Sequence, residues 1–169
     1  MRNLHALTVV GVLVTLLGIS SIVKQREGTQ AAEMLTGADI AEIQQLYARY
    51  NQGLDFGDKE LFMSAFADDA VYTTGGGEVY SGKEGLTEWV TPILSTGPPT
   101  VIHNNTSILI TPTSEGAKGR GYWILMNVEQ REPSPIFSGY YEDTFIKTAN
   151  GWRIKTRGSM RGWASGASQ

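Results

Sequence analysis

The chain has 169 residues, which is enough for one domain with a hydrophobic core. It contains no cysteine and two histidines, which excludes disulfides and the usual zinc sites built from cysteine and histidine. Residues 1–31 hold three of the 14 basic and one of the 17 acidic residues, which leaves 11 basic against 16 acidic and a formal charge of −5. The remainder has no basic stripe, so nucleic-acid binding is not expected.

Residues 7–23 carry no charge, and they lie between Arg2 and the charged segment 24–27. This pattern predicts a signal peptide or a short membrane anchor in residues 1–31, the stretch being slightly shorter than the ~20 residues of a full span. We therefore expect an exported protein, periplasmic or secreted, or one anchored through residues 7–23. A linker over residues 32–35, a domain over 36–163 and a flexible tail over 164–169 complete the predicted organisation.

Two helices are predicted at the start of this domain. The first begins at Thr36, whose hydroxyl can cap it together with Asp39 three residues later. Apolar residues then recur at helical spacing until Gly57 ends the helix, namely Ile40, Ile43, Leu46, Tyr47, Tyr50 and Leu54. Asp58 can cap a second, short helix, with the apolar residues Leu61, Phe62 and Phe66.

The remaining pattern changes from helices to strands. Residues 70–73 predict a strand, and the glycine run 75–77 predicts a hairpin turn into residues 78–80, because it lacks the lysine of a phosphate-binding loop. A third helix begins at Ser81 or Gly82 and is closed by Pro92. Strands follow over residues 100–111, 117–130, 136–147 and 151–160. This order predicts an α+β domain, with a curved antiparallel sheet wrapped over about three N-terminal helices.

His103 is the histidine available for proton transfer near neutral pH, since His5 lies in the N-terminal segment. Strand alternation places it on one sheet face with Val101, Asn105, Ser107 and Leu109.

The following predicted strands contain a candidate ligand-binding space and a candidate ion pair. Gly119 and Gly121 share the face of Trp123, which leaves room for a ring-shaped ligand or for another side chain. Asp143 can pair with Arg153 or Arg157 across neighbouring strands.

Three stretches resemble a known family: residues 46–58 together with 66–72, the tripeptide 103–105, and residues 138–143 together with 150–154. Over residues 36–161 the chain resembles the SnoaL-like group of the NTF2-like superfamily, which implies a cone-shaped α+β fold. That superfamily includes lyases, isomerases, hydrolases and proteins that only bind, so the fold does not by itself fix an activity.

The functional pattern is similar to scytalone dehydratase and its relatives, which remove water from a cyclic hydroxyketone. The resemblance implies that Asp55 is the aspartate at the helix end, Tyr72 a site tyrosine and His103 the first site histidine. The chain departs from the pattern elsewhere: Leu54 stands at the second tyrosine, Glu129 or a neighbour at the second histidine, and Glu142 or Asp143 at the strand asparagine.

We therefore predict a cofactor-free and metal-free acid–base lyase or isomerase, dehydratase-like, acting on a small hydrophobic cyclic or hydroxycarbonyl compound. His103 acts as base and acid, Asp55 orients it, and Tyr72 donates a hydrogen bond to a carbonyl oxygen. The residues predicted to bind substrate are Tyr50, Phe66, Asn105, Trp123 and Glu142.

The alternative is a non-catalytic module that binds a small molecule or a protein through the same fold. In that case Asp55 only caps the turn into Gly57, and His103 is a hydrogen-bonded wall residue. Contact between the two side chains favours the enzyme, whereas separation beyond one bridging water favours the binder. An apolar outer sheet face predicts a homodimer through Tyr122, Ile124, Met126 and Val128. Membrane contact is expected only through the N-terminal segment.

Overall fold

The computed structural model describes residues 34–96, 100–129 and 131–162, which belong to one unit comprising residues 32–169. The predicted leader in residues 1–31 and the predicted tail at 164–169 lie outside the described residues. None of the helices in the described ranges is long and apolar enough to cross a membrane.

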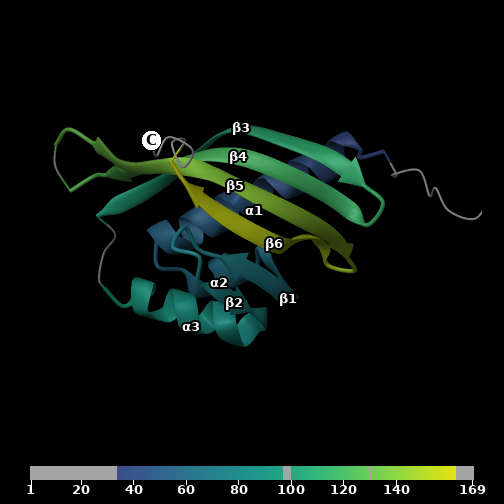
Figure 1. Ribbon diagram of the computed structural model, residues 1–169, viewed down its shortest axis with the longest axis horizontal. Helices are drawn as coiled ribbons and strands as arrows, with labels where there is room; N and C mark the ends of the chain where they lie inside the picture. Colours follow the sequence, from purple (N-terminus) through teal and green to yellow (C-terminus); the bar gives the residue numbers. More distant parts are fainter. Residues whose placement is uncertain (1–33, 97–99, 130, 163–169) are drawn as a thin grey trace, which may run out of the picture. The chain divides into compact units, whose positions relative to one another are not determined.

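The described chain forms helices first and most of the sheet afterwards (Figure 1). Its elements are α1 (Gly37–Asp55), α2 (Lys59–Met63), β1 (Phe66–Thr73), β2 (Val79–Ser81), α3 (Gly82–Leu94), β3 (Val101–Thr113), β4 (Gly116–Asn127), β5 (Ser134–Thr148) and β6 (Gly151–Arg161). The strand order is β2-β1-β6-β5-β4-β3. The α+β prediction is confirmed, but the sheet is mixed rather than wholly antiparallel. β1 lies between β2, with which it pairs antiparallel, and the last strand β6, with which it pairs in parallel.

The helix ends follow the predicted capping chemistry. Asp39 N–H donates to the Thr36 hydroxyl over 3.2 Å, and Thr36 N–H donates to the Asp39 carboxylate over 2.9 Å. α1 ends at Asp55, after which Gly57 has a φ of 70° that suits glycine. Asp58 caps α2 by accepting from Leu61 N–H at 2.8 Å.

α3 continues two residues past Pro92, where the sequence predicted its end. A proline removes its own backbone donor but leaves later amides free to bond backwards. Ser95 N–H accordingly donates to the carbonyl of Thr91 over 3.1 Å.

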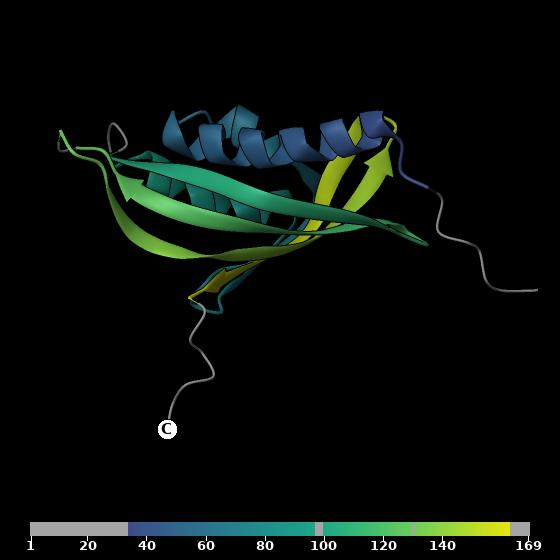
Figure 2. The ribbon, with the colours of Figure 1, turned by 90° about the horizontal axis from the view of Figure 1, so that it is seen from above.

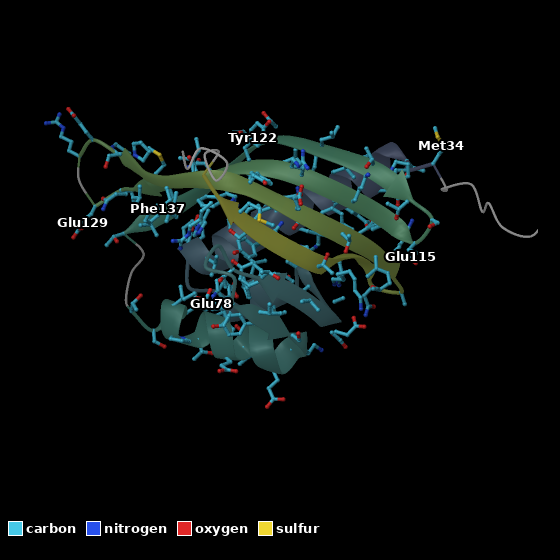
Figure 3. All side chains as sticks on the ribbon, viewed as in Figure 1. Met34, Glu78, Glu115, Tyr122, Glu129 and Phe137 are labelled. Carbon is cyan, nitrogen blue, oxygen red and sulfur yellow. The ribbon has the colours of Figure 1, made fainter. Side chains whose placement is uncertain are left out.

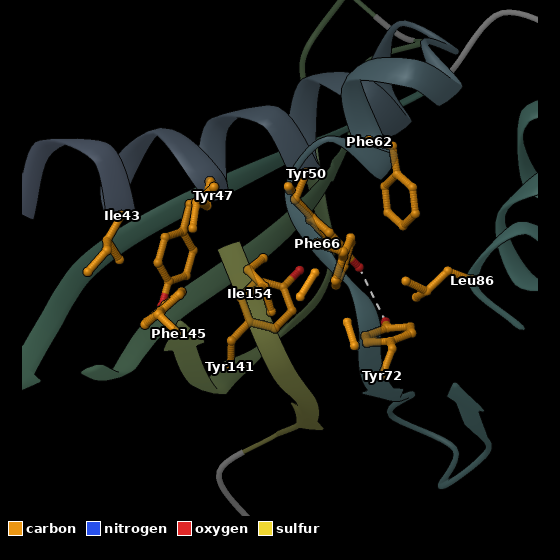
Figure 4. Packing of buried hydrophobic residues seen from close by; sticks show 14 of the residues in the cluster. Ile43, Tyr47, Tyr50, Phe62, Phe66, Tyr72, Leu86, Tyr141, Phe145 and Ile154 are labelled. Carbon is orange, nitrogen blue, oxygen red and sulfur yellow. Dashed lines mark hydrogen bonds between the residues drawn. The ribbon is translucent and has the colours of Figure 1, made fainter. Parts of the chain in front are cut away.

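α1 runs along one face of the sheet (Figure 2), and the core lies between that face and the helices. Figure 4 shows side chains of α1 and β6 meeting there, among them Ile43, Tyr47, Tyr50 and Ile154. Burial of such large side chains is the main favourable contribution to folding. Because α1 covers the sheet, its last turn carries Leu54 and Asp55 into the same layer as the inward face of β3.

The contact between α1 and α2 depends on Gly53. A Cβ atom at Gly53 would lie 2.5 Å from the backbone nitrogen of Phe62, closer than real Cβ atoms approach backbone. We expect Gly53→Ala to lower the free energy of unfolding by about 1–3 kcal/mol or more, measured by urea denaturation. Gly37→Ala is the matched control, because nothing lies within 4 Å of its added methyl group. Equal stability of the two variants would contradict this account of the helix contact.

Two register shifts change which residues face the helices. In β3 the pairing shifts between Thr106 and Leu109, and Ser107 has a φ of 51°. Val101, His103 and Asn105 therefore face inward with Ile108 and Ile110, whereas Leu109 is 66% exposed. The prediction that Ser107 and Leu109 share the face of His103 is wrong, since an extra residue in a bulge reverses the alternation.

The second shift lies between β5 and β6. Phe145 pairs with Ile154, but Thr144 pairs with Thr156, so β6 carries one extra residue, Lys155. Ile154 and Arg157 both face inward as a result. The bulge therefore sets which residues of β6 lie on the inward face of the sheet.

Candidate functional site

Asp55 and His103 are in direct contact. The Asp55 Oδ1 atom lies 2.5 Å from His103 Nδ1, and Asp55 Oδ2 accepts the backbone N–H of His103 at 2.9 Å. The end of α1 supplies the carboxylate and the start of β3 supplies the histidine. An ionised carboxylate only accepts hydrogen bonds, so in the neutral imidazole this contact favours the tautomer with the hydrogen on Nδ1 and a free lone pair on Nε2. The two bonds fix the imidazole against the helix end.

His103 lines a cavity of about 340 Å³, at the small end of the range for small-molecule sites. Its walls come from α1, α3, the β1–β2 hairpin and the inward faces of β3 to β6. The lining side chains are mostly apolar or aromatic, and include Leu54, Trp89, Ile93, Val101, Trp123, Leu125, Phe137 and Tyr141. The His103 side chain is 19% exposed and lines this cavity, so the imidazole is largely shielded from solvent.

Two tyrosine hydroxyls meet in the same wall. Tyr50 Oη and Tyr72 Oη lie 3.2 Å apart, and both residues line the cavity. The dashed line in Figure 4 marks this hydrogen bond. Burial raises the pKa of Tyr50 well above its ordinary value and also raises the pKa of Tyr72. Both phenols therefore stay neutral near pH 7, and one of them can donate a hydrogen bond to a ligand.

A buried ion pair lies behind these tyrosines. Arg157 is 1% exposed, and its Nε and Nη2 atoms donate to Asp143 over 2.9 and 2.7 Å. The guanidinium carbon lies 4.4 Å from the ring centroid of Tyr50 and 4.1 Å from that of Tyr141. Burial acts to lower the pKa of Arg157, but the Asp143 carboxylate outweighs it and the pKa is raised. The pair fixes the rings that form the cavity wall.

The space beside Gly119 and Gly121 is occupied by protein. A Cβ atom at Gly119 would lie 2.8 Å from the Phe145 ring and 3.0 Å from Tyr47 Oη, and one at Gly121 would lie 3.3 Å from the Tyr47 ring. Tyr47 therefore fills this part of the sheet face, and the cavity lies toward His103 instead.

Three of the predicted substrate-binding residues do not line the cavity. Glu142 points to the outer face, where it pairs with Arg120 beside a separate open groove of about 560 Å³ that does not include His103. The prediction for Glu142 is wrong because Asp143, its neighbour on β5, is the inward residue. Phe66 packs in the core against Phe62, and Asn105 accepts from Asn51 Nδ2 at 2.5 Å. The predicted residues Tyr50, Tyr72, His103 and Trp123 do line the cavity, and Asp55 holds His103 from behind.

Sequence reasoning missed Ser159 and Arg161, which line the cavity, and did not expect the buried guanidinium of Arg157 to lie behind its wall. Counting alternate residues from Ile154 places all three on the outer face. The bulge at Lys155 turns them to the cavity face, where Arg157 is buried and Arg161 stays exposed at the end of the strand. Trp89, on the predicted third helix, also lines the cavity. Its place opposite β3 depends on how α3 packs, which leaves no signal in the local pattern.

Comparison with known proteins places this geometry in a family. The family model described as the SnoaL-like domain matches residues 36–158. Comparison with curated proteins found no significant match. An NTF2-like protein with a cystatin-like fold from Novosphingobium aromaticivorans is similar in structure, with a TM-score of 0.66 at 21% identity over 77% of this chain and 86% of the other.

Two enzymes are among the similar solved structures. The hexachlorocyclohexane dehydrochlorinase LinA-type3 from Novosphingobium barchaimii has a TM-score of 0.63 at 22% identity, over 75% of this chain and 88% of its own. A protein assigned as a scytalone dehydratase from Novosphingobium aromaticivorans has a TM-score of 0.62 at 19% identity, over 74% and 85%. At these identities the likeness shows the fold, and the family match covers most of the described residues. The chain belongs to the SnoaL-like domain family, within the NTF2-like α+β fold.

Proposed function

We propose that this protein is a cofactor-free acid–base lyase or isomerase that acts on a small hydrophobic cyclic or hydroxycarbonyl compound. The observation that carries the proposal is the 2.5 Å contact between Asp55 and His103, with the imidazole at the wall of a mostly apolar cavity. A neutral histidine held through Nδ1 offers Nε2 as a general base, and its position at a cavity wall is what such a base needs.

The residues support an elimination of water. His103 Nε2 takes the proton from the carbon next to a carbonyl, and the Asp55 carboxylate stabilises the resulting imidazolium. The carbon–oxygen bond to the neighbouring hydroxyl then breaks as the carbon–carbon double bond forms. His103 returns its proton to the leaving hydroxide, which departs as water. A phenol of the Tyr50–Tyr72 pair stabilises the enolate oxygen as a neutral donor.

The similar solved structures agree with this class of reaction. Their names describe a dehydrochlorinase and a dehydratase, and both activities remove a proton and a leaving group from the substrate. The shared step is proton abstraction from carbon, and the leaving group differs. We therefore propose elimination as the reaction class, and the substrate panel below distinguishes water from chloride as the leaving group.

The test is conversion of a panel of cyclic β-hydroxyketones and cyclic chlorinated hydrocarbons, without added cofactor. Loss of water from a β-hydroxyketone gives a conjugated enone, which is followed by ultraviolet absorbance, and chloride release is followed directly. We expect at least one compound to be converted by the wild type and not by His103→Gln. Conversion that persists unchanged in His103→Gln would contradict the proposal.

A further inference from the structure

Arg161, the last residue of β6, lies at the cavity that His103 lines. Its guanidinium carbon is 5.1 Å from the ring centroid of Phe137, a cavity residue of β5 labelled in Figure 3. Its side chain packs against Gly75 of the β1–β2 hairpin, where a Cβ atom would lie 2.7 Å from Arg161 Cγ and 2.8 Å from Nε. Gly75 therefore leaves the room in which this arginine lies.

Arg161 forms no salt bridge with a described residue. Among the described residues, the salt bridges involve other basic side chains, including Arg120 and Arg157. Glu78 lies close enough for Arg161 to contribute to lowering its pKa, but its carboxylate accepts from the Thr74 hydroxyl instead. Arg161 is exposed at the end of β6, so its charge can be met by a ligand at the edge of the cavity.

A second donor without a partner lies across Gly139 from Arg161. On the sheet, Trp123 of β4 pairs with Gly139 of β5, which in turn pairs with Arg161 of β6. The Trp123 ring lies over Gly139, where a Cβ atom would be 2.7 Å from Cζ2 and 2.9 Å from Cε2, the ring atom bonded to Nε1. Trp123 Nε1 is buried and has no hydrogen-bond partner within the described ranges. Buried donors normally have acceptors, so a ligand atom is the natural partner.

We propose that Trp123 Nε1 and Arg161 together bind a carboxylate, and that the natural ligand is an organic acid with a small apolar or aromatic body. A guanidinium matches a carboxylate geometrically, and a single cation with one neutral donor offsets one negative charge. The apolar residues Leu125, Trp89 and Tyr141 surround the body of this ligand.

The separation of His103 and Arg161 across the sheet fits a small molecule. β3, which carries His103, and β6, which carries Arg161, are three strand spacings apart, roughly 14 Å along the curved sheet. Both residues line the same cavity. A carboxylate on Arg161 therefore directs the opposite end of the ligand toward His103 Nε2. This substrate class rests on the proposed function, because it uses the same cavity.

The test compares two probes with the same body, trans-cinnamate and cinnamyl alcohol, by isothermal titration calorimetry on the full chain. We expect the wild type to bind cinnamate roughly tenfold to a hundredfold more tightly than the alcohol, the range for a hydrogen bond to a charged group. Arg161→Gln should remove this preference by lowering the affinity for cinnamate to about that for the alcohol. Arg161→Lys should keep part of it, since an ammonium retains the charge but not the planar geometry.

Arg153→Gln is the matched control. Arg153 lies on the same strand, does not line this cavity, and donates to the carbonyl of Trp152 over 2.6 Å. The same loss of preference in Arg153→Gln would show a general effect of net charge and overturn the proposal. A wild type without preference for cinnamate would overturn it as well.

His103→Gln separates this inference from the proposed function. If the variant loses turnover and keeps the preference for cinnamate, both stand. If no compound is ever converted but the preference depends on Arg161, the cavity binds acids without catalysis. If turnover depends on His103 and the preference does not depend on Arg161, the carboxylate assignment alone is wrong.

Discussion

Replacing His103 with glutamine is expected to lower kcat/KM for the converted compound by roughly 10²–10⁴-fold, the usual contribution of a positioned general base. Glutamine keeps a polar side chain at the wall but cannot accept a proton at neutral pH. The loss should lie in kcat, because the imidazole acts on the transition state rather than on the apolar contacts that bind the substrate. Steady-state kinetics of the purified variant provide the measurement.

Asp55→Asn is expected to produce a similar loss, although Asp55 does not touch the substrate in this account. An amide cannot stabilise the imidazolium, and it can turn its NH₂ group toward Nδ1, which favours the wrong tautomer. Asp58→Asn is the matched control, since Asp58 only caps α2 and asparagine caps equally well. A full rate in Asp55→Asn, or an equal loss in Asp58→Asn, would contradict the role of the pair.

Replacing Arg157 with methionine is expected to lower the free energy of unfolding by about 3–5 kcal/mol, because it leaves the Asp143 carboxylate buried without its partner. The variant also loses the cation between Tyr50 and Tyr141. Urea denaturation followed by circular dichroism measures the change. The double variant Arg157→Met with Asp143→Leu should recover much of the loss, since no unpaired charge remains.

Arg120 provides the control for this experiment. Its pair with Glu142 lies on the outer face of the same sheet and is open to solvent, so Arg120→Met should change stability little. If Arg157→Met were no more destabilising than Arg120→Met, the buried pair would not hold the cavity wall as described.

The helices and their ends could be predicted from the sequence because their causes are local. Thr36 and Asp39 cap α1, Asp58 caps α2, and Gly57 ends the first helix through its backbone conformation. The contact between Asp55 and His103 was also predictable, since the family resemblance places both residues in the cone. Their contact in the structure confirms the proximity, while their catalytic roles stay predictions.

The part of the site contributed by β6 could not be predicted from alternation. A bulge adds one residue to one strand, and a count of alternate residues then gives the wrong face beyond it. Leu109 and Arg161 are both placed on the wrong face by such a count. Glu142 and Asp143 are adjacent on β5, so a shift of one residue in the expected register exchanges which of them faces the cavity side and which faces outward.

The extent of the cavity depended on packing across layers. The sequence predicts free space beside Gly119 and Gly121, but the side chain of Tyr47 from α1 occupies it. Nothing within β4 indicates which helix side chain lies above it. The cavity therefore lies toward His103, where Leu54 and Trp89 leave space.

The tautomer of His103 tests the central claim most directly, and ¹⁵N nuclear magnetic resonance of the imidazole measures it. His5→Gln, a change outside the described residues, removes the signal of the other histidine. We predict that at a pH where His103 is neutral, Nδ1 carries the hydrogen and is bonded to Asp55, while Nε2 is unprotonated. A spectrum in which Nε2 carries the hydrogen would contradict the account, because no base would then face the cavity.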